Sequence, residues 1–373
     1  FRRELALGPN TETVNGLRIG SSGFVTCLEK SAEQSGWYQK FRKLPFGQGI
    51  GIAGSWYLSG TNYPINPAAN PQSNVQIKAD RSDLITLFCG AADIGQGSDA
   101  MLRHVVAEEL GVDPNRCKVE SQDSDICPVD LGSYSSRVTL MAGNAAISAA
   151  RHLKNQILQV IAQDWHTSTK QLMIADDRVF PLDQPQRSMS FVKALNRAES
   201  VLGALGSTGS YNSPNRGGLY RGALVGPSPA YSFTVHIAEL EVDLNSGQIK
   251  MNRVVAAHDC GRAIHPQLVE GQIEGSVYMG MGEALLERYE TAKGLVSQPN
   301  LLEYKMPTIL DVGTIESILV ESPDPDGPFG AKEAGEGPLH PVIPAIANAI
   351  YDAIGLRLYQ TPFEPSQILK ALE

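Results

Sequence analysis

One carboxylate in this chain stands in a stretch too rich in glycine to belong to a core. Glu336 lies between Gly335 and Gly337 and precedes Pro338, within residues 327–338. Glycine neighbours let the backbone approach a ligand closely and leave the carboxylate uncrowded, which suits a general base. The alternative is structural, because the helix dipole favours an acidic side chain near the start of the following helix. The loop alone leaves both interpretations open.

A glycine loop at residues 92–98, Ala-Asp-Ile-Gly-Gln-Gly-Ser, is the second candidate, and it lies between a predicted strand and a predicted helix. Backbone amides at a helix start bind phosphate, and Gln96 could present its amide to the edge of a heterocycle. We expect Ser98 to cap the helix. The loop is neither Gly-x-Gly-x-x-Gly nor a Lys-bearing P-loop, which argues against ordinary dinucleotide and nucleoside triphosphate sites. A purely structural turn is the alternative.

Two further stretches combine polar side chains with glycine. Residues 132–139, Gly-Ser-Tyr-Ser-Ser-Arg-Val-Thr, offer several hydroxyl groups and one guanidinium, which suit an anion such as phosphate. The alternative is a solvated loop that caps the next helix. Residues 257–275 contain two histidines and Asp259 at a spacing that matches no standard metal motif. Gln272, between glycines, is a better candidate for contact with a flat cofactor. The chain has no Gly-x-Ser-x-Gly elbow, which argues against Ser-His-Asp hydrolysis.

Composition excludes several classes of function. The chain has 373 residues, 42% hydrophobic residues and a net charge of -9, with no run rich in Lys or Arg. Nucleic acid and anionic membrane surfaces are therefore disfavoured as partners. No apolar run approaches the about 18 residues of a membrane span, and no secretory signal follows Phe1. Five scattered cysteines without Cys-x-x-Cys do not suggest disulfides, zinc or iron-sulfur ligation. We expect a cytoplasmic protein with reduced thiols.

The hydrophobic patterns predict an α+β fold with two similar subdomains of β-hairpins and helices around a shared crevice. Each subdomain would consist of a hairpin, a glycine loop and a helix. The expected strands are 75–79, 84–89, 233–244 and 249–257, and the expected helices are 27–35, 99–110, 144–162, 269–286 and 344–354. We expect a connecting arm at residues 1–50, a first subdomain at 51–202 and a second at 203–373.

Together and in this order, the motifs resemble a known family. The chain is similar to the C-terminal half of the molybdenum-binding subunit of the xanthine oxidase family of molybdenum hydroxylases. The resemblance covers nearly the whole chain, and its most specific part is Phe329-Gly-Ala-Lys-Glu-Ala-Gly-Glu. The other motifs are Ile94-Gly-Gln-Gly, Gly132-Ser-Tyr-Ser-Ser-Arg, and Asp259-Cys-Gly followed by Val269-Glu-Gly-Gln. Within the family, the sequences of these motifs most resemble those of the 4-hydroxybenzoyl-CoA reductases. His265 stands where the family usually has Asn.

The resemblance implies a molybdopterin dinucleotide, usually the cytosine form in bacteria, whose dithiolene holds the molybdenum without a direct protein ligand. Glu336 matches the family's active-site glutamate and would act in proton transfer. The alternative of a helix-start acid becomes less attractive in that context. The residues expected to contact the cofactor are Gly95, Gln96, Gly97, Ser98, Ser135, Ser136, Arg137, Thr139, Asn144, Asp259, Gly261, Gln272, Lys332, Glu333, Ala334 and Gly335.

The resemblance also implies partners. The family's molybdenum subunit is about twice as long, so the missing N-terminal half would lie elsewhere. The chain carries no iron-sulfur or flavin motif, so an iron-sulfur subunit and an FAD subunit are expected to accept the electrons. The expected substrate is a small aromatic or N-heterocyclic molecule, with an aromatic acyl-CoA first and a purine, nicotinate or aldehyde as the alternative. A catalytically silent assembly subunit is the alternative from a different class of protein.

Overall fold

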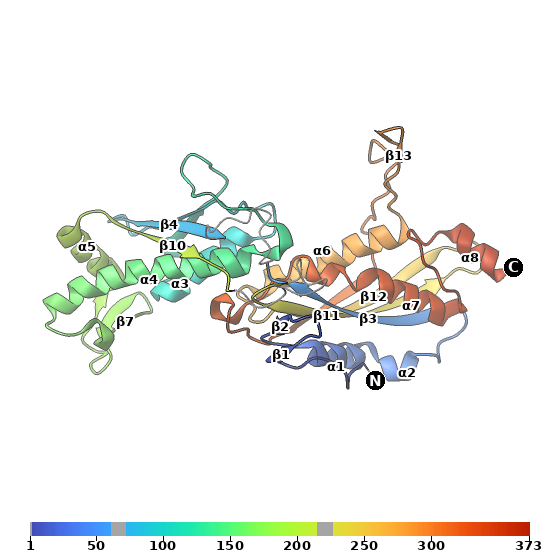
Figure 1. Ribbon diagram of the computed structural model, residues 1–373, viewed down its shortest axis with the longest axis horizontal. Helices are drawn as coiled ribbons and strands as arrows, with labels where there is room; N and C mark the ends of the chain where they lie inside the picture. Colours follow the sequence, from blue (N-terminus) through green and yellow to red (C-terminus); the bar gives the residue numbers. More distant parts are fainter. Residues whose placement is uncertain (1, 61–71, 215–226) are drawn as a thin grey trace.

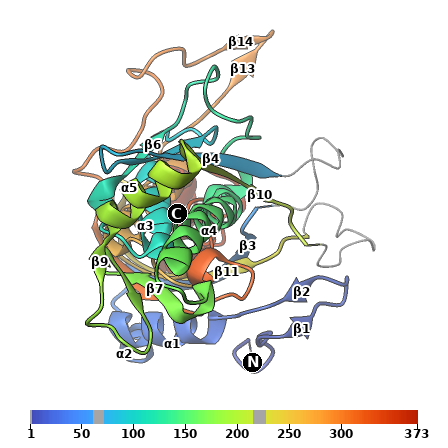
Figure 2. The same cartoon turned by 90° about the vertical axis from the view of Figure 1, so that its left-hand side faces the viewer.

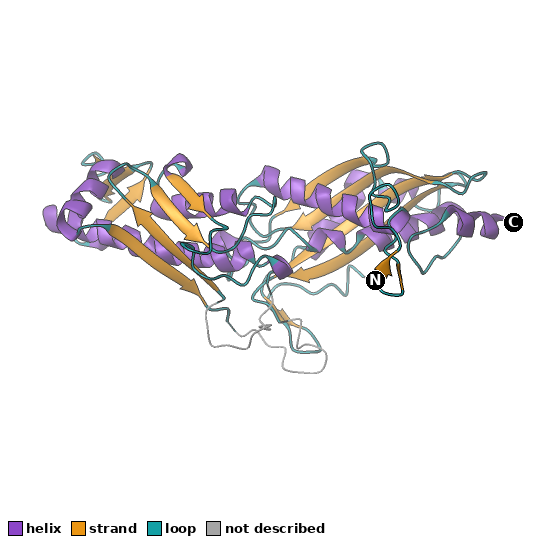
Figure 3. Cartoon of the chain, turned by 90° about the horizontal axis from the view of Figure 1, so that it is seen from above, coloured by secondary structure: helices purple, strands orange, loops and turns teal. Residues whose placement is uncertain are grey.

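Two four-stranded sheets form the α+β protein, and they lie end to end in an elongated molecule (Figures 1 and 3). The structure is a computed structural model that describes residues 2–60, 72–214 and 227–373. The first sheet has the order β10 (Leu205–Tyr211), β4 (Ser73–Ala79), β5 (Ile85–Cys89), β6 (Cys117–Glu120). The second has the order β3 (Gln48–Leu58), β11 (Tyr231–Val242), β12 (Ile249–Asp259), β15 (Thr314–Val320).

The two sheets share one topology. In each sheet the first three strands are antiparallel and the last pair is parallel. The two central strands, β4 and β5 or β11 and β12, form the hairpin that the sequence predicts. A helix then connects the hairpin to the parallel edge strand: α3 (Ser98–Leu110) in the first sheet and α6 (Pro266–Leu285) in the second. This shared order supports the expectation of two similar subdomains.

A long helix follows the parallel edge strand in both halves, α4 (Val138–Asp164) in the first and α7 (Val342–Ile354) in the second. Each packs unusually closely on a strand through glycine. A Cβ added at Gly209 of β10 would lie 2.1 Å from the carbonyl oxygen of Ala145 in α4. A Cβ at Gly51 of β3 would lie 2.2 Å from that of Ala345 in α7. Small residues therefore set the distance between helix and sheet in both halves.

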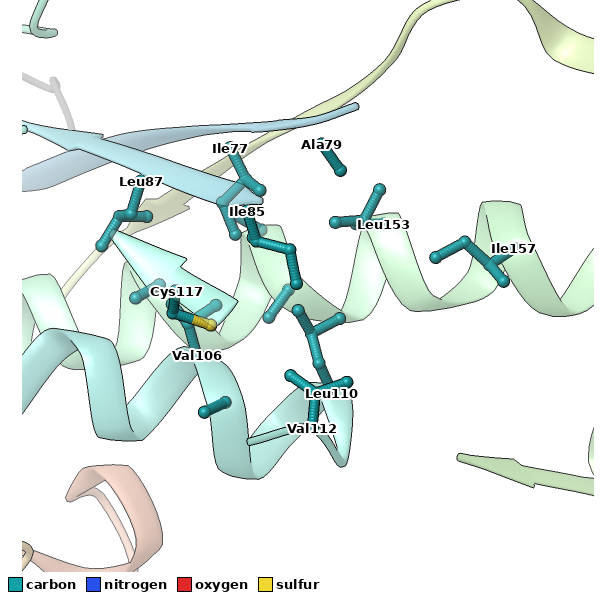
Figure 4. Packing of buried hydrophobic residues seen from close by; sticks show 14 of the residues in the cluster. Ile77, Ala79, Ile85, Leu87, Val106, Leu110, Val112, Cys117, Leu153 and Ile157 are labelled. Atoms are coloured by element: carbon teal, nitrogen blue, oxygen red, sulfur yellow. The ribbon is translucent and has the colours of Figure 1, made fainter. Parts of the chain in front are cut away.

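Each sheet has its own hydrophobic core. In the first, side chains of β4 and β5 pack against α3 and α4, and Figure 4 shows Ile85 and Leu87 above Leu110 and beside Leu153. In the second, α6 and α7 pack on one face of the sheet. Helix α1 (Phe24–Ser35) covers the other face, next to the short α2 (Trp37–Lys40). The cores hold the ends of both hairpins, and the loops beyond them, in fixed positions.

The subdomain boundaries expected at residues 50 and 202 do not coincide with the limits of the two sheets. Residues 1–50 are not only a connecting arm, because α1 packs on the second sheet and β3 pairs with β11 from Gln48 to Leu58. Likewise β10 belongs to the first sheet, although residues 203–373 were expected to form the second subdomain. Both strands are rich in glycine, which resembles a loop in sequence, but the helices packed on them require that glycine. Residues 61–71 and 215–226 lie outside the described residues.

Each sheet and the helices packed on it are here called a body. The remaining elements extend the two bodies, and Figure 2 shows the molecule from the end of the first body. The first carries α5 (Phe191–Leu202) and a small sheet of β7 (Leu172–Ala175), β8 (Arg178–Pro181) and β9 (Met189–Ser190). The second carries α8 (Pro365–Leu372) and two hairpins, β1 (Thr11–Glu12) with β2 (Arg18–Ile19), and β13 (Thr291–Ala292) with β14 (Leu295–Val296). No helix in the described ranges is long and apolar enough to cross a membrane.

The helices expected from periodicity are confirmed, with different ends. The helix expected at 144–162 begins at Val138, and the one expected at 269–286 begins at Pro266. Ser98 is not the cap of α3, as expected, but its first residue; the cap position is Gly97, with φ 80°. A left-handed φ favours glycine there. The Asp93 carboxylate, and not a serine hydroxyl, accepts from the N–H groups of Gly97 and Asp99 at 3.3 and 3.1 Å.

Candidate functional site

Loops from both bodies line one crevice of about 440 Å³. They follow equivalent strands, because β5 and β12 lead into the two glycine loops and β6 and β15 lead into the loops before α4 and α7. The expected site residues on its wall are Gln96, Gly97, Ser98, Ser136, Thr139, Gln272, Lys332, Glu333, Ala334, Gly335 and Glu336. The shared topology therefore explains why four loops, distant in sequence, meet at one place.

Glu336 is exposed at this crevice, and a serine of the other body holds it. The Ser136 hydroxyl donates to Oε2 of Glu336 at 2.8 Å, and the Glu336 backbone N–H donates to the same hydroxyl oxygen at 3.0 Å. The residue precedes a 3₁₀ turn at Gly337–Leu339, and α7 begins only at Val342. Glu336 is thus not an acid of the first turn of α7, and its carboxylate is available at the crevice.

Tyr57 of β3 lies beside Glu336, and no feature of the sequence distinguished it. Its ring packs edge to face on His340, with 4.8 Å between the ring centroids. Burial raises the pKa of the Tyr57 hydroxyl, and the charge of Glu336 and a side-chain hydrogen bond to it raise it further. The phenol therefore stays protonated and serves as a hydroxyl donor next to the carboxylate. The position depends on the pairing of β3 with β11, which puts Tyr57 opposite Ser232.

The charged end of Lys332 points away from the crevice into the protein. Its ammonium lies 2.5 Å from Oδ2 of Asp259 and 3.1 Å from the Ser21 hydroxyl, and both charged side chains are fully buried. Asp259 also accepts hydrogen bonds from the backbone N–H groups of Gly23 at 2.8 Å and Gly261 at 3.1 Å. Asp259 and Gly261 do not line the crevice. They fix the loop that does.

Glu333 is buried in the same way. Its carboxylate accepts hydrogen bonds from the Ser232 hydroxyl and from the backbone N–H of Gly337, the latter at 3.2 Å. The backbone of Glu333 donates to the Ser59 hydroxyl at 3.1 Å, and its carbonyl lies 2.9 Å from Nε2 of His258. The carboxylate of Glu333 therefore does not face the crevice freely. The backbone of residues 331–335 is the part of this loop that a ligand can contact.

Four other expected contacts lie off the crevice wall: Gly95, Ser135, Arg137 and Asn144. The Arg137 guanidinium, which was expected to meet a phosphate, is buried in an ion pair with Asp130 at 2.6 Å and also donates to the carbonyl of Gly132 at 2.9 Å. The Asn144 amide donates to the carbonyls of Leu140 and Asp326 at 2.8 and 2.9 Å. Arg137 and Asn144 therefore hold loops in place, because their donors already have partners.

The two glutamines on the wall differ in their availability. The Gln96 amide bonds within its own loop: it donates to the Ala92 carbonyl at 3.1 Å and accepts from the Ile94 N–H at 2.6 Å. Gln272 on α6 makes no side-chain hydrogen bond to the described part of the chain, and its Oε1 lies near Gly335. Gln272 is thus the glutamine whose amide is available for a ligand.

Several wall residues were not among the expected contacts, including Ser133, Tyr134, Arg262, His265 and Met279. Arg262 is exposed, and no carboxylate among the described residues pairs with it. His265, which replaces the usual Asn, caps α6: its Nδ1 accepts from the backbone N–H of Leu268 at 3.4 Å. The starts of α3 and α6 both lie at the crevice, but Asp93 accepts from the N–H groups of Gly97 and Asp99, and Pro266 at the start of α6 has no N–H. The Arg262 guanidinium is the group on this wall that can meet an anionic ligand. Arg262 lies inside the stretch 257–275 that the sequence analysis identified, and its position there could have indicated it.

Residues 26–313 match the family model of the molybdopterin cofactor-binding domain. The chain belongs to this family. Members of the family with similar sequences include the putative xanthine dehydrogenase molybdenum-binding subunit XdhA of Escherichia coli (strain K12), 31% identical over 376 residues that cover 98% of this chain and 48% of the relative. The xanthine dehydrogenase molybdenum-binding subunit of Escherichia coli O157:H7 is 31% identical over 365 residues, with 95% and 46% covered.

Solved structures show the same fold. The chain is similar to quinoline 2-oxidoreductase from Pseudomonas putida 86, with a TM-score of 0.85 and 21% identity, over 97% of this chain and 47% of that one. This chain thus spans about half the length of the molybdopterin cofactor-binding relatives that it matches. Among the described residues, no group of three or more His, Cys, Asp or Glu side chains is placed to hold a metal ion.

Proposed function

We propose that this chain forms half of the molybdenum-cofactor site of an oxidoreductase of the xanthine oxidase family, and that Glu336 transfers a proton there. The observation that carries the proposal is the exposed carboxylate of Glu336, bonded to Ser136, on a crevice of a chain from the molybdopterin cofactor-binding family. A general base needs an accessible carboxylate with a fixed orientation, and this one has both. A silent assembly subunit would have no use for it.

The crevice fits a pterin with a phosphate-bearing tail. Its volume of about 440 Å³ is in the range of small-molecule sites. The exposed Arg262 guanidinium can pair with a phosphate, and the Gln272 amide can bond the edge of a heterocycle. Gly97 on the same wall has a left-handed φ of 80°, which favours glycine there. We propose a molybdopterin dinucleotide, in the cytosine form, as the ligand.

The residues of the chain have separate roles in this proposal. When bound, the cofactor supplies two-electron redox chemistry at its metal. Glu336 accepts and returns a proton, while the Ser136 hydroxyl is bonded to its Oε2. Tyr57 and Ser136 orient the carboxylate from two sides. The ion pair of Lys332 and Asp259 anchors the loop, so that Glu336 keeps its position on the crevice wall.

The substrate that we propose is a planar aromatic or N-heterocyclic molecule. The two Escherichia coli relatives are named for xanthine, which favours a purine. The sequences of the motifs resemble those of the 4-hydroxybenzoyl-CoA reductases, so an aromatic acyl-CoA is the second candidate. Nicotinate and aldehydes remain to be compared with these. The direction of net reaction, hydroxylation or reductive removal of a hydroxyl group, follows from which of them turns over.

Partners are part of the proposal. The rest of the molybdenum subunit would complete the crevice, and an iron-sulfur subunit and an FAD subunit would carry the electrons. The relatives support this, since one is named as subunit gamma of the 6-hydroxypseudooxynicotine dehydrogenase complex of Paenarthrobacter nicotinovorans.

Elemental and nucleotide analysis of the complex purified through this chain tests the proposal. We expect about one molybdenum for each copy of the chain, and CMP after acid hydrolysis of the cofactor. The same preparation is then assayed with xanthine, nicotinate, 4-hydroxybenzoyl-CoA and benzaldehyde and an artificial electron acceptor or donor. A complete complex that contains no molybdenum would leave the assembly role as the better explanation.

A further inference from the structure

The second body carries a projection that the crevice does not explain. Residues 287–312, here called the arm, leave the end of α6 and return to β15. The arm contains β13 and β14, and its hairpin stands away from the body in two perpendicular views (Figures 1 and 2). Each of the two strands has only two residues, so the hairpin cannot be stable by its own pairing.

The arm exposes large apolar side chains at high density. Its six most exposed are Tyr289 at 70%, Leu295 at 74%, Leu301 at 72%, Leu302 at 78%, Ile309 at 86% and Leu310 at 92%. Single exposed apolar residues are ordinary on protein surfaces, but a cluster of this kind on one short segment marks an interaction site. An apolar segment with no core of its own needs a surface on which to pack.

The base of the arm is fixed to the helix that lines the crevice. The Tyr278 hydroxyl of α6 donates to the carbonyl of Pro307 at 2.7 Å. Within the arm, the Tyr304 hydroxyl donates to Oε2 of Glu287 at 2.6 Å and closes its base. Met279, the neighbour of Tyr278, lines the crevice and is 52% exposed. The helix that carries the base of the arm is therefore also a helix of the crevice wall.

We propose that the arm is the docking site for the part of the molybdenum subunit that this chain does not span. This inference rests on the proposed function, because the occupant is the rest of the same subunit. The Escherichia coli relative matches 98% of this chain with 48% of its own length, so about as much chain again must pack beside the matched half. The family match, residues 26–313, includes the arm, which is thus part of the domain and not an added tail. A protein that completes the crevice meets α6, and the arm is bonded to that helix through Tyr278 and Pro307.

Amine cross-linking of the native complex tests the proposal. Lys293 and Lys305 are exposed on the arm, and Lys170 and Lys193 are exposed controls on the first body. We expect the arm lysines to link to the sequence that aligns with the uncovered half of the Escherichia coli relative, whether it lies on the same polypeptide or another. Links from the arm to a second copy of this chain, identified by mixing isotopically labelled and unlabelled chains, would overturn it. Links only to the iron-sulfur or FAD subunit, or no arm links beyond this chain, would also overturn it.

A second measurement uses variants of the same complex. We expect Leu301→Ser with Leu302→Ser to increase the rate of tryptic cleavage after Lys293 and Lys305 at least tenfold, because the arm would no longer be covered. The matched control is Leu182→Ser with Val201→Ser. These two residues of the first body are 53% and 47% exposed, and their replacement should leave the cleavage rate unchanged. Equal cleavage in the two double variants and the parent would contradict docking. Absent molybdenum with intact arm links would refute the proposed function and leave the docking of the two halves standing.

Discussion

The ammonium of Lys332 lies 2.5 Å from Oδ2 of Asp259, and neither side chain is exposed to solvent. This ion pair joins the loop after β12 to the loop after β15, four residues before Glu336. It ties together two segments that are 73 residues apart in the chain. Since the same loops form adjacent parts of the crevice wall, the pair determines the shape of the site without facing it.

Removal of the Lys332 charge should be costly. Lys332→Met leaves the Asp259 carboxylate buried and unpaired, so we expect the free energy of unfolding to fall by about 3–5 kcal/mol. The control is Lys118→Met, which breaks an exposed pair with Glu120 and should cost under about 1 kcal/mol. Thermal unfolding of the complex measures both. Adding Asp259→Leu to Lys332→Met should restore part of the loss, and equal melting temperatures for the two single variants would contradict a buried structural pair.

Ser136 is expected to act through Glu336. Ser136→Ala removes the hydroxyl bonded to Oε2, and a lost hydrogen bond to a charged group of about 1.4 kcal/mol corresponds to a roughly tenfold fall in kcat. KM and molybdenum content should change little, because the variant alters the orientation of a carboxylate and not the binding of the cofactor. Ser210→Ala, which removes an exposed hydroxyl bonded to Asn74, is the control. A rise in KM or a fall in cofactor content of similar size would point to a structural role instead.

Gly261 is required for two separable reasons. Its φ is 69°, and an added Cβ would lie 2.2 Å from the carbonyl oxygen of Gly330. Gly294 on the arm has φ 80° with no heavy atom near such a Cβ. Gly294→Ala should therefore lower the free energy of unfolding by about 1 kcal/mol from the backbone alone. Gly261→Ala should cost about 1–3 kcal/mol more and reduce cofactor content.

The comparison of these two glycine variants requires only melting curves and a molybdenum assay. Equal losses at both positions would mean that the close approach of the 260–262 loop to the 330–332 loop has no energetic importance.

Periodicity and turn residues were sufficient for most of the framework. Alternation from Phe233 to Leu244 and the turn at 245–247 predict the hairpin of β11 and β12, and the glycine loops mark where both hairpins end. Strand β3 could not be predicted in this way. Its residues Gly49, Gly51 and Gly54 resemble a loop. The reason for Gly49 and Gly51 is the close approach of α7, a helix from the other end of the chain, and Gly54 lies against Phe24 of α1.

The candidate site shows the same limit at the level of single side chains. A motif indicates that Lys332 and Arg137 matter, but not the direction in which they point. Both turn inward because a carboxylate is buried nearby, Asp259 in one case and Asp130 in the other. Tyr57 was missed because its place beside Glu336 depends on strand pairing across the sheet, which no local pattern contains.

His236 should make the protein sensitive to acid. It lies fully buried in β11, and neither ring nitrogen has a hydrogen-bond partner among the described residues. Burial, and then the neighbouring His258, lowers the pKa of His236 to about 3, below its unfolded value of about 6.5. The unfolded state therefore binds an extra proton as the pH falls below 6.5. The stabilisation is fully present above that pH and is lost toward pH 3, by up to about 5 kcal/mol.

His236→Leu removes this proton-binding group, so the loss of melting temperature between pH 7.5 and pH 5 should be smaller in the variant than in the parent protein. His166→Gln, at an exposed position, should leave the loss as it is. An unchanged pH dependence in His236→Leu would contradict a neutral buried histidine.

Glu336→Gln tests the central claim most directly. Gln keeps the size of the side chain and can still bond Ser136, but it cannot accept a proton at neutral pH. Turnover of whichever substrate the complex uses should fall by at least about a hundredfold, in line with the usual contribution of a general base. Molybdenum content, released nucleotide and melting temperature should match those of the parent complex. Turnover within a factor of about two of the parent, with the cofactor present, would contradict the role assigned to Glu336.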